Sequence, residues 1–152
     1  ADFEDEIILS SVNKLLSMQM AETYSAVDIC VVDLKNALAD FVKVGAPTSF
    51  VKHTDSTDAV DGSGALPIGI LQNISPSISK KLLCVDDIIV LCSDGIVDAF
   101  GDPELLRTFV NDTQTKNPQE LANLILQKAQ YLNDDVPKDD MTVLCARIFV
   151  NV

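Results

Sequence analysis

The sequence has no tryptophan, a single histidine, few basic residues and no long hydrophobic run. Against 23 Asp and Glu stand only 11 Lys and Arg, which gives a formal net charge of −12 at pH 7. Phosphate backbones and anionic lipids repel such a chain, so we expect no nucleic-acid partner and no membrane-surface binding. The longest apolar runs hold about five residues, whereas a membrane-spanning helix needs about 20. We therefore expect a soluble, acidic, single-domain chain or a piece of one.

The four cysteines form no Cys-x-x-Cys motif and share no regular spacing. They are Cys30, Cys84, Cys92 and Cys145, and each lies in an apolar, strand-like segment. A free cysteine in such a segment behaves as a small buried hydrophobic residue. Metal binding and a reactive thiol are the alternatives, but zinc is disfavoured because the single His53 has no cysteine at ligand spacing. Unpaired cysteines are typical of a reducing compartment, and no secretory signal pattern opens the chain, so we expect a cytoplasmic location.

Length and hydrophobic content favour one folded unit over residues 1–152. A domain of this size buries about 70% of the surface that its unfolded chain exposes. The hydrophobic fraction of 47% excludes a disordered chain. No internal repeat, low-complexity tract or linker divides the sequence.

Hydrophobic periodicity and capping residues predict three helices. The first covers residues 4–18 and has an apolar face made of Ile8, Val12, Leu15 and Leu16. The other two begin at Asp102-Pro103 and Asn117-Pro118, where a capping side chain precedes a proline that is tolerated in the first helical turn.

Runs rich in β-branched residues predict six strands, over 25–34, 38–45, 48–52, 76–84, 86–92 and 141–150. The turns between the first three strands are too short for a parallel crossover, so these strands are expected to be antiparallel. Residues 53–65 are predicted to form a polar surface loop, and Ser93-Asp94-Gly95 a break after the fifth strand. The segregation of strands and helices predicts an α+β fold with helices packed on a mainly antiparallel sheet.

Carboxylates are the chemical groups that stand out, since the chain has no glycine-rich phosphate loop and no nucleophile motif. Asp94 directly follows a buried-looking strand, and Asp139 and Asp140 directly precede another. A carboxylate in such a place is costly to desolvate, and a divalent cation compensates it. Mg²⁺ and Mn²⁺ prefer oxygen ligands and keep several waters, so a few Asp side chains suffice. A bound cation would also polarise a phosphoryl group.

Taken alone, each acidic motif also has a simpler interpretation. An Asp-Gly pair after a strand is typical of a turn. An Asp pair before a strand is typical of a solvated cap, or of an edge charge that discourages aggregation.

Three motifs in order carry a family resemblance: LPIGI at 66–70, DIIVLCSDGIV at 87–97 and DDMTVL at 139–144. Together they resemble the bacterial protein phosphatase 2C family. More narrowly, they resemble the phosphatase domain of the sporulation stage II protein E family. ETYSAVDI at 22–29 and VKVGAPTSFVK at 42–52 strengthen the narrower match.

The resemblance implies a Mn²⁺- or Mg²⁺-dependent protein serine/threonine phosphatase, built as an antiparallel β-sandwich flanked by helices. It implies that Asp94 and Asp139 are metal ligands in a two-metal site, with secondary roles for Asp140, which orients the site, and Gly95. A metal-activated water would attack the phosphoserine phosphorus directly. The implied substrate is a phosphorylated anti-sigma-factor antagonist, whose dephosphorylation frees a sigma factor during sporulation.

One part of the family pattern is missing from these residues. The family carries an Asp-Gly motif near the start of its domain, whose Asp bridges the two metals, but the first Asp-Gly here is Asp61-Gly62, in the wrong loop. We therefore expect the C-terminal two-thirds of one such domain, with little or no phosphatase activity by itself. Apolar sheet surface and an open edge would then be exposed, which predicts self-association. The resemblance also implies that the parent protein has a membrane anchor in a region outside this sequence.

Two alternatives stay open. One is a non-catalytic protein-binding module of the same fold that acts in sigma-factor regulation. Retention of both Asp94 and Asp139 favours the enzyme, because a module without activity has no need of them. The other is an unrelated α+β domain with coincidental motifs.

Overall fold

The computed structural model describes residues 2–18, 24–62, 64–134, 136 and 138–149. In chain order the elements are α1 (Asp2–Ser17), β1 (Val27–Asp33), β2 (Leu38–Val44), β3 (Ser49–Lys52), β4 (Thr57–Val60), β5 (Ser77–Leu82), β6 (Ile88–Cys92), α2 (Asp94–Phe100), α3 (Pro103–Asp112), α4 (Pro118–Leu132) and β7 (Val143–Arg147). Within these ranges no helix is long and apolar enough to cross a bilayer.

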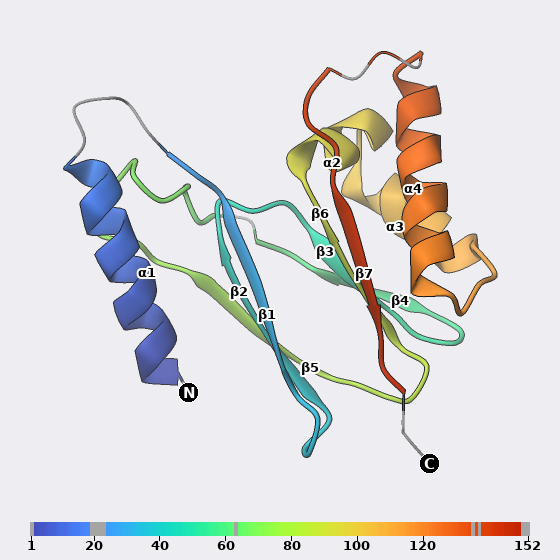
Figure 1. Ribbon diagram of the computed structural model, residues 1–152, viewed down its shortest axis with the longest axis horizontal. Helices are drawn as coiled ribbons and strands as arrows, with labels where there is room; N and C mark the ends of the chain where they lie inside the picture. The colour runs from blue at the N-terminus through green and yellow to red at the C-terminus, as the bar shows by residue number, and fades with distance from the viewer. Residues whose placement is uncertain (1, 19–23, 63, 135, 137, 150–152) are drawn as a thin grey trace.

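Two antiparallel sheets pack against each other as a sandwich (Figure 1). One has the strand order β1-β2-β5 and the other β4-β3-β6-β7. Val51 of β3 pairs with Ile89 of β6, and both pack in a buried cluster with Ala39 and Phe41 of β2. Side chains alternate along a strand, so the neighbours of Val51 and Ile89 face the other way. The expected α+β sandwich with flanking helices is confirmed.

Helices α2, α3 and α4 cover the outer face of the four-stranded sheet (Figure 1). Phe50, Ile88 and Val90 pack there with Leu121 and Ile125 of α4. The predicted starts of α3 and α4 are confirmed. The side chain of the residue before each proline, Asp102 or Asn117, accepts a hydrogen bond from a backbone N–H of the first turn.

Helix α1 covers the outer face of the three-stranded sheet, but of the four predicted side chains only Leu16 packs against the buried cluster there. Leu9 is buried with Val42, whereas Ile8 is 59% exposed and Leu15 65% exposed. The buried stripe contains Asn13, which is 1% exposed. Its side chain donates to two loop carbonyls and accepts from the backbone N–H of Gly69. The predicted face was wrong in three of its four residues, because the buried stripe runs through the polar Asn13 and turns the helix away from the purely apolar pattern.

Two further predictions about elements were wrong. Residues 53–65 contain the strand β4, because Thr57 and Val60 are buried while Asp58 points outward and pairs with Lys81 at 2.8 Å. Residues 93–95 end β6 as predicted, but they begin the helix α2 rather than a turn.

Smaller differences concern strand ends and one cysteine. Cys84 lies beyond the end of β5 and is exposed, so its predicted burial was wrong. The last strand is shorter than predicted, at Val143–Arg147, and residue 150 of the predicted range lies outside the described residues.

Candidate functional site

The two acidic motifs meet at one end of the four-stranded sheet. Asp94 begins α2, two residues after the end of β6, and Asp139 and Asp140 precede β7. These strands are antiparallel, with Cys92 opposite Val143. The end of one strand and the approach to the other therefore lie side by side, at the upper end of the sheet in Figure 1.

Ser93 links the motifs by three hydrogen bonds beyond the regular ladder. Its backbone N–H donates to the carbonyl of Thr142 at 3.0 Å. Its hydroxyl donates to the carbonyl of Asp140 at 3.0 Å and accepts from the backbone N–H of Thr142 at 3.0 Å. The backbone approaching β7 is thus attached to the residue directly before Asp94.

Because Gly95 has no side chain, the backbone at the start of α2 can pack directly against the backbone of Asp140. A Cβ atom at this position would lie 2.5 Å from the carbonyl oxygen of Asp140 and 3.3 Å from the Cβ of Asp139. The first of these distances is too short for any residue with a side chain. The glycine of the Ser-Asp-Gly motif is therefore required by packing against the second acidic motif.

Both predicted ligands present a carboxylate to solvent. Oδ1 of Asp94 accepts from the N–H of Gly95 at 3.0 Å, and Oδ1 of Asp139 accepts from the N–H of Asp140 at 2.7 Å. Among the described residues, neither Oδ2 has a hydrogen-bond partner, and no Lys, Arg or His forms an ion pair with either carboxylate. Each side chain is held at one oxygen and leaves the other for a ligand.

This donor set fits a hard divalent cation in part. Exposed carboxylate oxygens beside backbone carbonyls suit Mg²⁺ or Mn²⁺, which keep waters in their remaining positions. Within the described ranges, however, no group of three or more His, Cys, Asp or Glu could hold a metal. The chain thus supplies part of a ligand set, and waters or groups from elsewhere would have to complete it.

Three of the four thiols pack among hydrophobic residues: Cys92 and Cys145 beneath the helices and Cys30 between the sheets. Burial raises the pKa of Cys92 to about 12 and that of Cys145 to about 12, and with nearby Asp28 it raises that of Cys30 to about 11. Thiols buried in this way are chemically inert. They pack as hydrophobic residues.

A buried ion pair at the same end of the sandwich was not found from the sequence. Lys43 of β2 is 1% exposed and donates to Asp28 of β1 at 2.7 Å, to Ser49 of β3 at 2.8 Å and to the carbonyl of Pro47 at 2.6 Å. Oδ1 of Asp28 is buried without a hydrogen-bond partner. The sequence feature that could have indicated this ion pair is the lysine inside the apolar strand β2. These hydrogen bonds of Lys43 join the three-stranded sheet to Ser49 of β3 in the four-stranded sheet.

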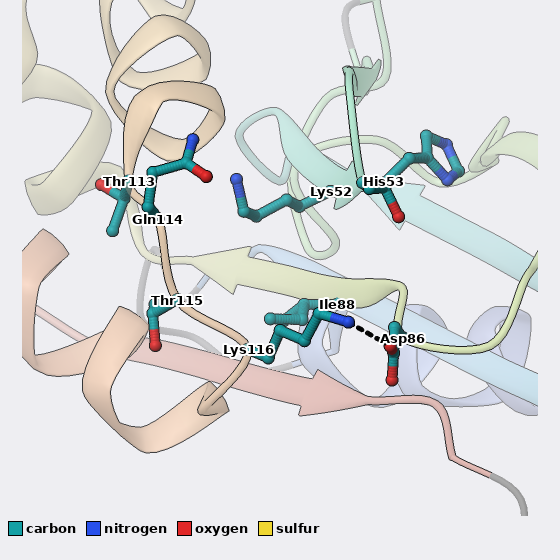
Figure 2. Close-up of a pocket in the computed structure, with 9 residues that line it drawn as sticks. Lys52, His53, Asp86, Ile88, Thr113, Gln114, Thr115 and Lys116 are labelled. Carbon is teal, nitrogen blue, oxygen red and sulfur yellow. Dashed lines mark hydrogen bonds and ion pairs between the residues drawn. The ribbon is translucent and has the colours of Figure 1, made fainter.

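A second concave region lies at the opposite end of β6 (Figure 2). It has a volume of about 270 Å³ and is lined by residues that include Lys52, His53, Asp86 and Lys116. These basic groups already have partners. Lys52 donates to two carbonyls at the end of α3, and Lys116 pairs with Asp86. Since the five residues of β6 span roughly 16 Å, this cavity is separate from the acidic motifs.

The two-sheet sandwich, with the Ser-Asp-Gly start of α2 packed on the Asp-Asp segment before β7, defines the class as a protein phosphatase 2C-type domain. The solved phosphatase domain of the cell fate determinant SpoIIE from Bacillus subtilis, presoaked with Mn, superposes with a TM-score of 0.76 at 28% identity. The match covers 97% of this chain and 68% of that one. A second structure from that organism, holding the PP2C phosphatase domain and a fragment of the regulatory domain, gives 0.84 at 30% identity, over 95% of this chain and 44% of that one.

The family itself is shown by the sequence. The model of the Stage II sporulation protein E (SpoIIE) family matches residues 1–149, and the chain belongs to that family. Stage II sporulation protein E of Bacillus subtilis (strain 168) is 31% identical over 150 residues. That alignment covers 95% of this chain but only 18% of the relative, so the chain corresponds to a small part of the whole protein.

Proposed function

We propose that this chain is part of a metal-dependent protein serine/threonine phosphatase domain, with Asp94 and Asp139 as ligands of Mn²⁺ or Mg²⁺. The observation that supports this most is the contact of Gly95 with Asp139 and Asp140, which places the two carboxylate-bearing segments together. Neither carboxylate is neutralised by a basic side chain in the described part of the chain. Because both carboxylates are exposed, negatively charged and close together, a divalent cation is the ligand that they would bind.

The roles of the residues follow from their contacts. Asp94 and Asp139 would hold the cation through the oxygens that the backbone N–H groups leave free. Asp140 would orient Asp139 by donating its backbone N–H, and Gly95 would keep the two segments at contact distance. When bound, the metal supplies Lewis-acid polarisation of the phosphoryl group and acidifies a water.

For the substrate we propose a phosphorylated anti-sigma-factor antagonist acting in sporulation, in the cytoplasm. Family membership supports this assignment. The formal charge of −12 supports a requirement for metal, because an acidic protein repels a phosphorylated partner until a cation is bound. The same charge argues against nucleic acid as a partner.

We further propose that the chain by itself turns over little or no substrate. Two carboxylates can hold one metal weakly, but they cannot assemble a two-metal clamp without the bridging Asp of the family motif. A non-catalytic protein-binding module of the same fold, acting in sigma-factor regulation, is the second candidate.

The test is hydrolysis of a phosphoserine peptide in Mn²⁺, by this chain alone and by this chain preceded by the remaining part of the Bacillus subtilis phosphatase domain. We expect no turnover by the chain alone, and turnover by the extended protein that is lost in its Asp94→Asn variant. Extended protein that is folded and binds the phosphopeptide without hydrolysing it would favour the binding module. Robust turnover by the chain alone would contradict the proposed inactivity.

A further inference from the structure

Ser93 occupies the N-cap position of α2, but its hydroxyl does not cap the helix. The backbone is extended there, with φ −73° and ψ 163°, as is usual for an N-cap residue. A serine at this position ordinarily accepts a hydrogen bond from an N–H two or three residues later. No such bond is present at Ser93. Capping of α2 therefore does not explain why residue 93 carries a hydroxyl group.

The hydroxyl instead uses its donor and one acceptor position on the second acidic motif. It donates to the carbonyl of Asp140 and accepts from the N–H of Thr142, each at 3.0 Å. Ser93 is adjacent in sequence to Asp94, and Asp140 is adjacent to Asp139. One side chain thus connects the residue next to one carboxylate with the residue next to the other.

We infer that Ser93 is a positioning residue that sets the spacing between Asp94 and Asp139 for a divalent cation, an inference that rests on the proposed function. Metal–ligand distances in protein sites lie within about 0.2 Å of their standard values, so both carboxylates must reach the cation together. Residues that orient the ligands change metal affinity by about 10–100-fold. In Ser93→Ala the freed carbonyl and N–H can bind water, because Asp140 and Thr142 are exposed. We expect that variant to fold, because the backbone bond from Ser93 to Thr142 and the strand pairing remain, but it loses the two side-chain bonds that fix the segment before β7 beside Asp94.

A Mn²⁺ titration followed by NMR tests this inference on the intact chain. The readout is paramagnetic broadening of the backbone amide signals of 94–96 and 139–141. We expect Ser93→Ala to lower the apparent affinity about tenfold or more, and Ser93→Thr, which keeps the hydroxyl, to retain the wild-type affinity. Ser11→Ala is the control, since it also removes a hydroxyl-to-carbonyl bond, of 2.7 Å to Ile7, but on α1. It should bind Mn²⁺ like the wild type.

A second readout needs no metal. The amide of Thr142 should exchange with solvent faster in Ser93→Ala than in the wild type, and Ser93→Thr should restore its protection. Unchanged exchange of Thr142, equal Mn²⁺ affinity in Ser93→Ala, or equally weak affinity in Ser93→Thr would each overturn the role of Ser93. Failure of the proposed function has a different signature: wild-type broadening that persists in an Asp94→Asn, Asp139→Asn double variant.

Discussion

Replacing Gly95 by alanine places a methyl group against the backbone of the second acidic motif. The added Cβ would lie 2.5 Å from the carbonyl oxygen of Asp140 and 3.2 Å from its carbonyl carbon. The neighbour is backbone, which cannot rotate away as a long side chain could. The φ of Gly95 lies outside the positive range, so the alanine is not strained in itself and the effect comes from the contact.

The magnitude follows from the distance. Cβ atoms essentially never approach within 3.0 Å of another heavy atom, so the segment at Asp140 must move by about 0.5 Å from its present 2.5 Å. Overpacking of this kind costs about 1–3 kcal/mol. The alanine recovers about 0.5–1 kcal/mol through its better helix propensity. The difference is a net loss of about 1 kcal/mol, and at most about 2.5 kcal/mol, in the free energy of unfolding. We also expect weaker Mn²⁺ binding, because the segment that carries Asp139 and Asp140 is displaced relative to Asp94.

Urea unfolding and Mn²⁺ titration of Gly95→Ala measure the two effects. Gly101→Ala is a suitable control, because Gly101 ends the same helix at φ +76° with nothing within 4 Å of an added Cβ. Backbone strain should destabilise this control by about 1 kcal/mol without altering Mn²⁺ binding. A Gly95→Ala protein that is as stable as the wild type and binds Mn²⁺ equally well would refute the contact and the reasoning built on it.

Three further predictions concern other parts of the chain. Lys43→Met leaves the Asp28 carboxylate buried without its cation and should lower the free energy of unfolding in urea by about 3–5 kcal/mol. Adding Asp28→Asn should recover part of the loss. Equal stability of Lys43→Met and wild type would contradict the buried pair. The hydrogen bond from Lys116 holds the pKa of Asp86 below its ordinary 3.8, so the stability that this carboxylate contributes is present above that value and is lost as pH falls through the lowered pKa. Asp86→Asn should therefore show a shallower acid dependence of unfolding below about pH 4, and an unchanged slope would count against the ion pair. Ile8 is 59% exposed on α1, so Ile8→Glu should reduce self-association in light scattering without loss of stability, and a monomeric wild type at high concentration would exclude the association.

Structural elements could be predicted from the sequence where the interactions that determine them are between residues close together in the chain. The starts of α3 and α4 were predicted because Asp102 and Asn117 cap their helices within three residues. Most strands were predicted because alternation and turn residues act over short distances. The position of Asp94 at the end of one strand and Asp139 before another was also readable from the order of the segments.

The interactions that escaped prediction are long-range. The buried face of α1 depends on Asn13, whose partners Leu71 and Gln72 lie far along the chain. The local pattern of Ser93 and Gly95 is that of a turn, and only their contacts with the segment before β7 explain both residues. A sequence pattern can nominate the two acidic motifs, but their juxtaposition is a property of the antiparallel pairing of β6 and β7.

Calorimetric titration of Mn²⁺ into the wild-type chain and into the Asp94→Asn, Asp139→Asn double variant tests the central claim most directly. The account predicts weak binding by the wild type, at about millimolar affinity because two carboxylates are only part of a ligand set, and none by the double variant. Identical heats from both proteins would contradict it and would leave the two carboxylates as solvated ends of β6 and β7.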